Sequence, residues 1–158
     1  MTYTLQKPWQ KSEIIHYTQC LIHSYKHWTK ESLFDLNTTP EKQAQILFEA
    51  PFVVVSQGVE LDPILNYGNK KALELWELDW EDFIQLPGRE TAERIERADR
   101  QKFLKDAASK GFIKNYTGIR VSSTGRRFHI QDVLVWNVLD ENNRKCGQAA
   151  MFKSWKFV

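Results

Sequence analysis

The order of the expected secondary-structure elements restricts the fold of this chain most. A continuous apolar, β-branched run at 52–56 predicts a buried strand, and 64–67 predicts a second strand after a short loop. Helical segments follow between residues 70 and 110, and residues 112–157 have the pattern of β structure. A doubly wound parallel sheet needs alternating strands and helices throughout. This order therefore predicts an α+β fold, with one antiparallel sheet and helices gathered on one face.

Local signals delimit the helices and turns. Asn69 and Asp79 are the expected N-caps of two short helices, and Gly111 is a left-handed stop for the long charged helix before it. A tight turn at 123–125 joins two strands, and 145–157 is expected to be one last strand.

Two further helices are expected before the first strand, from residue 12 to about 32 and from Pro40 onward. We therefore expect an N-terminal helical extension over 1–47 and a sheet domain over 48–158. The first helix carries an apolar and partly aromatic stripe made of Ile14, Leu21, Tyr25 and Trp28. This stripe must be buried on the chain's own sheet or on a second copy, and we predict a homodimer through this helix or the sheet.

Composition and charge indicate a globular protein without nucleic acid or membrane as a partner. Hydrophobic residues make up 42%, and the net charge is only +2 with the basic residues spread out. No segment resembles a signal peptide, and none approaches the roughly 18 apolar residues of a membrane span. Cys20 and Cys146 lie far apart in the sequence and are expected to be free thiols, which favours a cytoplasmic location.

Six segments resemble a known family. They are FEAPFVVVS at 48–56, DPILNYGN at 62–69, LELW at 73–76, RETAE at 89–93, SSTGRRF at 122–128 and GQAA at 147–150. Together they are similar to the MEKHLA domain family, which is described as PAS-like and includes stand-alone bacterial proteins. The resemblance implies a PAS-like five-stranded sheet in the order 2-1-5-4-3 and a sensory or binding role. The family also occurs in plant homeodomain–leucine zipper factors, but this chain has neither of those elements.

A row of possible metal ligands lies on the first helix. His16, Cys20, His23 and His27 fall within roughly 60° of arc. These residue types bind zinc, copper or nickel, and His23 with His27 is the best i, i+4 pair. The row lies opposite the apolar stripe, so a solvent-exposed face is the simpler interpretation, and we predict no metal site.

The strand at 126–139 carries the main ligand-anchor candidate. Its alternation places Phe128, Ile130, Asp132, Leu134, Trp136 and Val138 on one side, which is the better core face. A carboxylate on that face needs a partner, so Asp132 is expected either to anchor a ligand or to pair with Arg120 or a tyrosine. A bulge that turns Asp132 outward is the third possibility.

Further ligand-pocket candidates, including Arg120, surround the same face. Trp136, Tyr116 and Phe103 belong to an aromatic set that forms either a cavity wall or plain core. Arg89 suits an anionic ligand or an ion pair with Glu93 or Asp62. The cofactor is unknown. Flavin photochemistry is disfavoured because the NCRFL-type cysteine motif is absent, and haem because residues 69–111 contain no histidine.

We therefore predict a non-catalytic PAS-like module that binds an unidentified small molecule, protein partners, or both. No phosphate loop, HExxH, GxSxG or GxGxxG motif occurs. The alternatives are a structural adaptor with a filled core and a small enzyme with Asp132 as its general base.

Overall fold

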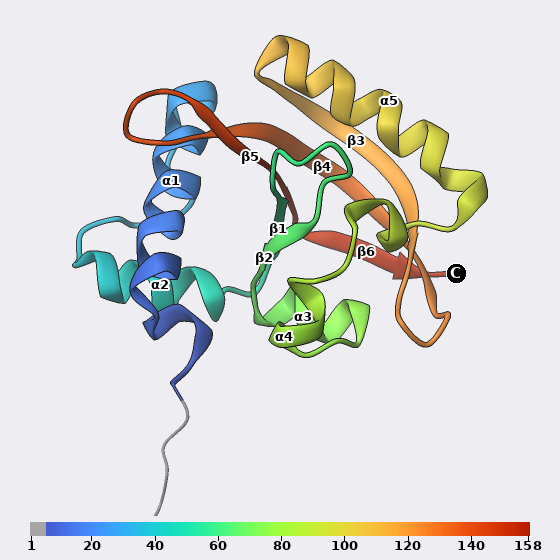
Figure 1. Cartoon of the computed structure of the whole chain (residues 1–158), viewed down its shortest axis with the longest axis horizontal. Helices are drawn as coiled ribbons and strands as arrows, with labels where there is room; N and C mark the ends of the chain where they lie inside the picture. Colours follow the sequence, from blue (N-terminus) through green and yellow to red (C-terminus); the bar gives the residue numbers. More distant parts are fainter. Residues whose placement is uncertain (1–5) are drawn as a thin grey trace, which may run out of the picture.

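The computed structural model describes residues 6–158, which form one antiparallel sheet with helices against both of its faces (Figure 1). The strands are β1 (Val53–Gln57), β2 (Leu65–Gly68), β3 (Phe112–Val121), β4 (Arg127–Leu139), β5 (Lys145–Phe152) and β6 (Ser154–Phe157). Their order is β2-β1-β5-β4-β3, with β6 beside β4, so the predicted order is confirmed.

The prediction of one continuous last strand is wrong. The chain bends at Lys153 and continues as β6. β5 pairs with the second half of β4, from Leu134 onward, and β6 pairs with the first half, from Phe128 to Gln131. The final segment therefore follows the whole length of β4 as two strands.

The helices begin and end where local signals place them. They are η1 (Pro8–Gln10), α1 (Ser12–Thr29), α2 (Pro40–Phe48), α3 (Lys70–Trp76), α4 (Trp80–Phe83), η2 (Gly88–Thr91) and α5 (Arg94–Lys110). Thr39, Asn69 and Asp79 each accept a hydrogen bond from a backbone N–H of the first turn that they cap. Gly111 ends α5 with a φ of 93°, and a Cβ there would collide with the Trp28 ring. Within residues 6–158, no helix is both long enough and apolar enough to cross a bilayer.

Alternating residues of the central strands supply two apolar clusters, one on each face of the sheet. Val133 and Val135 of β4 pack with α3, α4 and α5, as predicted for the middle helices. Leu134 and Trp136 face the other way and pack with α1 and α2. In Figure 1, α1 and α5 lie on opposite sides of the strands.

The aromatic stripe of α1 is buried against the chain's own sheet. The Tyr25 ring meets the Trp136 ring edge-on at 5.2 Å, and Trp28 Nε1 donates to the carbonyl of Asn137 at 2.8 Å. Ser24 Oγ accepts a hydrogen bond from Leu139 N at 2.9 Å. Intramolecular packing thus covers the face on which the homodimer prediction rested, and the division at residue 48 stays a prediction.

Asn69 links three elements through one fully buried side chain. Its Oδ1 accepts hydrogen bonds from Ala72 N of α3 at 3.2 Å and from Val54 N of β1 at 3.1 Å. Its Nδ2 donates to the carbonyls of Leu47 and Phe52, at 3.2 and 2.8 Å. The residue therefore joins α2, β1 and α3 as well as capping a helix.

We expect Asn69→Ala to lower the free energy of unfolding by about 2–4 kcal/mol, because it leaves several buried backbone groups unpaired. Asp79→Ala is the matched control, since Asp79 is also an N-cap but makes one exposed cap bond, at 2.9 Å. Its expected cost is about 1 kcal/mol. Urea denaturation followed by tryptophan fluorescence measures both. Equal losses in the two variants would contradict the linking role of Asn69.

Candidate functional site

A small cavity, here called the inner cavity, lies between the sheet and the helices α3 and α5. Its volume is about 50 Å³. Most of its wall is apolar and comes from β1, β2, β4 and β5, together with Trp76 and Leu104. Thr91, Arg100, Tyr116 and Arg120 bring polar atoms to it. The inner cavity thus combines an apolar wall with two guanidinium groups.

Arg120 and Tyr116 reach the inner cavity from β3. Arg120 is only 5% exposed, and its Nη2 donates to the Tyr116 hydroxyl at 2.9 Å while Nη1 donates to the carbonyl of Ile119 at 2.9 Å. The Tyr116 hydroxyl donates in turn to Asp99 Oδ2 at 3.3 Å. The chain of hydrogen bonds from Arg120 therefore reaches a carboxylate only through Tyr116.

Arg100 reaches the inner cavity from the opposite side, on α5. Its Nη2 donates to Gln57 Oε1 at 2.9 Å. The pKa of Arg100 is lowered to about 10, mainly by burial and also by the positive charges of Arg120 and Arg97, against the opposing effect of Tyr116. Within residues 6–158, neither Arg100 nor Arg120 takes part in an ion pair. Two like charges thus approach one another in a mostly apolar setting.

A larger hollow, the outer groove, adjoins the inner cavity and shares Arg100 and Leu104 with it. Its volume is about 250 Å³, and the amide side chains of Gln57 and Gln148 line it. Arg89 lies in its wall, where its Nη2 pairs with Asp62 Oδ2 at 3.1 Å. Arg89 thus makes one of the two predicted ion pairs.

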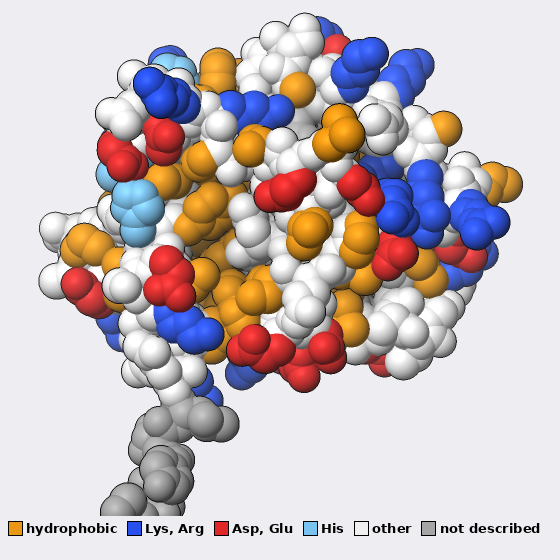
Figure 2. Space-filling model, in the orientation of Figure 1, with side chains coloured by type: hydrophobic (Ala, Val, Ile, Leu, Met, Phe, Trp, Pro, Cys, Tyr) orange, Lys and Arg blue, Asp and Glu red, His pale blue; other side chains and the backbone are white. Residues whose placement is uncertain are grey.

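The helix beside the outer groove is basic. α5 carries six basic and three acidic residues. Lys and Arg side chains gather on the surface where α5 begins (Figure 2). Such a field attracts anions toward the groove.

The expectation that Asp132 lies on the core face is wrong, and the third possibility, a bulge that turns it outward, is the one found in β4. Between the paired residues Gly118–Ile130 and Tyr116–Val133, β4 has one residue more than β3. Asp132 adopts a φ of 51° and is exposed. The bulge turns its carboxylate outward and reverses the facing of every later residue in β4.

Trp136 is displaced from the predicted pocket for the same reason. The reversal places it on the α1 side, where it is fully buried, and brings Val133 and Val135 to the inner cavity instead. Phe103 does not line the inner cavity either. Its ring packs on Tyr116, with the centroids 4.1 Å apart, and supports that side chain from outside.

The row of possible metal ligands on α1 is only partly brought together. His16 and Cys20 approach Glu141 of the β4–β5 turn, whereas His27 packs edge-on against Trp28. The preferred pair, His23 and His27, is therefore not the one that the structure assembles. Both cysteines are free, and although they are distant in sequence they pack in the same apolar cluster.

Sequence reasoning missed Arg100 and Gln57. The charged residues of α5 resemble a solvated face, which hides Arg100 among them. A usable signal was present, because Arg100 shares a helical stripe with Phe103, Leu104 and Ala107. Gln57 is the last residue of an apolar strand, and no sequence pattern indicates that its side chain lines a cavity.

The fold is that of PAS domains. The PAS domain of a protein from Colwellia psychrerythraea is 13% identical, with a TM-score of 0.63 over 75% of this chain and 95% of that chain. An RNA-binding light-oxygen-voltage receptor is 14% identical, with a TM-score of 0.64 over 78% of this chain and 36% of the receptor. A light-oxygen-voltage domain studied with a flavin analogue is 12% identical, with a TM-score of 0.58 over 74% of this chain and 84% of that chain.

The sequence itself matches a family model. The model is described as the MEKHLA domain and matches residues 15–157, from within α1 to the end of β6. No curated protein matches the chain. The segments that resembled this family therefore lie within one match that spans most of the chain.

We expect Asp132→Gly to stabilise the protein by roughly 0.5–1 kcal/mol, because glycine adopts a positive φ without a steric cost. Asp132→Val is expected to destabilise it by more than about 1 kcal/mol, since a β-branched residue is disfavoured in this region. Urea denaturation measures both changes. A clear loss of stability in Asp132→Gly would instead show that the carboxylate makes a needed contact.

Proposed function

Because the chain belongs to the MEKHLA domain family and has the PAS fold, we propose that it is a non-catalytic sensory module that binds a small organic anion. One observation carries this proposal. Arg100 and Arg120 meet at the inner cavity, and neither is in an ion pair within the described part of the chain.

The chemistry of the two guanidinium groups selects a carboxylate. Keeping two like charges in an apolar setting costs free energy unless an anion balances them. A guanidinium group binds a carboxylate through two parallel hydrogen bonds, which makes it well suited to this ligand. A ligand carboxylate between Arg100 and Arg120 would remove their repulsion and accept several charge-assisted bonds.

The volumes limit the size of this ligand. About 50 Å³ is far below the ~300–1,000 Å³ of ordinary small-molecule sites, so neither flavin nor haem fits the inner cavity. The adjoining outer groove of about 250 Å³ has room for the rest of a short molecule. Its Gln57 and Gln148 amides would hydrogen-bond polar groups there.

A path for signal transmission begins at Gln57. Gln57 is the last residue of β1. A ligand that binds Arg100 would compete with the hydrogen bond that Arg100 donates to Gln57. The neighbouring residue, Ser56, has its hydroxyl 2.8 Å from the hydroxyl of Tyr17 on α1. A shift of β1 would therefore move α1, which is the output that we propose.

The absence of catalysis is part of the proposal. Among the described residues, the lining of the inner cavity includes no histidine, cysteine or carboxylate that could act as a nucleophile or base. Asp132, the predicted general base, is exposed on the bulge and lines neither the inner cavity nor the outer groove. The adaptor with a filled core is the competing function, and the small inner volume favours it.

Other parts of the expected biology stay predictions. These are the cytoplasmic location, the stand-alone bacterial origin, protein partners and the lack of nucleic-acid binding. A homodimer also stays a prediction, and it would have to use surfaces other than the buried stripe of α1.

We expect acetate and propionate to bind the full chain, and the neutral amides acetamide and propionamide not to bind. In titrations followed by NMR, the side-chain signals of Arg100, Gln57 and Gln148 should shift. Arg100→Gln and Arg120→Gln should each weaken binding at least about tenfold, which corresponds to one lost charge-assisted bond. Arg127→Gln is the control, because Arg127 is paired with Glu93 and lines neither the inner cavity nor the outer groove.

Stability separates lost binding from lost folding. Arg100→Gln removes one of two repelling charges, so its melting temperature without ligand should not fall below that of the wild type. Binding that is equal for acids and amides, or absent for all four probes, would reject the anion sensor. If none of the four probes binds and native mass spectra show no retained small molecule, the structural adaptor with a filled core is favoured.

A further inference from the structure

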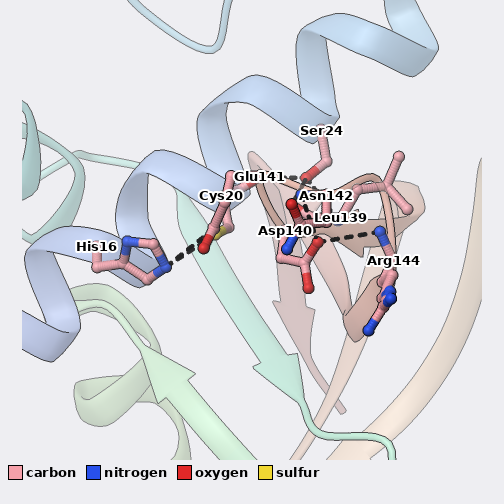
Figure 3. Close-up of polar contacts among 8 residues, drawn as sticks. All are labelled: His16, Cys20, Ser24, Leu139, Asp140, Glu141, Asn142 and Arg144. Carbon is pink, nitrogen blue, oxygen red and sulfur yellow. Dashed lines mark hydrogen bonds and ion pairs between the residues drawn. The ribbon is translucent and has the colours of Figure 1, made fainter.

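A second group of reactive side chains lies outside the inner cavity and outer groove, where α1 meets the β4–β5 turn (Figure 3). His16 Nε2 is 3.3 Å from Glu141 Oε2 and 3.9 Å from Cys20 Sγ. All three donor atoms lie within 4.8 Å of one another. An imidazole, a thiol and a carboxylate thus lie close together.

These separations resemble the edges of a zinc coordination tetrahedron. Zn–N, Zn–O and Zn–S bonds of about 2.0–2.3 Å place neighbouring donor atoms roughly 3.3–3.6 Å apart. The distance from His16 to Glu141 falls in this range, and the distance from His16 to Cys20 exceeds it slightly. Cys20 Sγ and the Glu141 carboxylate lie within 4.8 Å of one another, so small rotations of the exposed His16 and Glu141 side chains would bring the three donor atoms around one ion.

We propose that His16, Cys20 and Glu141 bind a Zn²⁺ ion, with its fourth position open to water. The three ligand types are those that zinc accepts in proteins. The cluster borders a hollow of about 200 Å³, which gives solvent access to the open position. This proposal is independent of the anion site.

The scaffold holds the ligands in place before any ion arrives. Ser24 Oγ donates to the carbonyl of Cys20 and accepts a hydrogen bond from Leu139 N, which ties α1 to the end of β4. Asp140 Oδ1 accepts hydrogen bonds from two backbone N–H groups of the turn, at 2.8 and 3.0 Å. The turn that carries Glu141 is therefore fixed against α1.

Cys20 forms the floor of the cluster. It is only 6% exposed, whereas His16 and Glu141 are exposed. Cys20 packs in the apolar cluster between α1 and the sheet, to which Cys146 of β5 also belongs, and this packing fixes the position of its side chain. The competing description is an exposed ion pair of His16 with Glu141 beside a buried thiol, which predicts no metal affinity.

The test is a calorimetric titration of the reduced, chelator-treated full chain with Zn²⁺. We expect one equivalent to bind with a Kd in the micromolar range or tighter. His16→Gln and Glu141→Gln should each weaken binding at least about tenfold. Both residues are exposed, so these variants decide the matter even where Cys20→Ser folds poorly. Titration with Co²⁺ should give a thiolate charge-transfer band that Cys20→Ser abolishes.

His27→Gln is the matched control, because His27 is exposed on the same helix and lies outside the cluster. It should leave the Zn²⁺ affinity unchanged. The proposal is overturned by any of three results. They are no Zn²⁺ binding, an equal loss in the His27 and His16 variants, and a cobalt–thiolate band that persists without the Cys20 thiol.

Discussion

The bulge at Asp132 decides what each face of the sheet presents. β4 is paired along its whole length and contributes to both apolar clusters, so a change of register inside it affects the entire core. Because of the extra residue, Val133 and Val135 line the inner cavity and Trp136 packs against α1. The neighbouring strand β3 contains a second bulge, where Asn115 has a φ of 62° just before Tyr116. The paired bulges let both strands change facing together.

Burial on both faces makes α1 and α2 part of the core. The sheet face under α1 holds Trp136 and Val138, which pack with the two N-terminal helices. Covering so large an apolar surface is worth about 1.5–3 kcal/mol for each buried side chain. The extent of the family match, which begins within α1, agrees with this dependence.

Features decided by neighbouring residues were predictable from the sequence, and features decided by register were not. The caps at Asn69 and Asp79 and the stop at Gly111 follow from local chemistry, and all three are confirmed. The facing of Trp136 depends on whether the pleat is interrupted at Asp132, and alternation contains no sign of such an interruption. Tyr116 and Arg120, on the neighbouring strand, line the inner cavity, whereas Asp132 and Trp136 do not.

The two proposed sites are connected through the contact between α1 and β1, and this has a thermodynamic consequence. His16 is adjacent in sequence to Tyr17, whose hydroxyl contacts Ser56 of β1, and the next residue of β1 is the partner of Arg100. An ion that fixes α1 would change the free energy needed to move β1, and an anion that moves β1 would change the affinity of the metal cluster. Linkage requires the two effects to be equal in size. Under both proposals, measuring the affinity for propionate with and without Zn²⁺ decides whether the sites are coupled. Equal affinities would mean that the contact between Tyr17 and Ser56 transmits nothing.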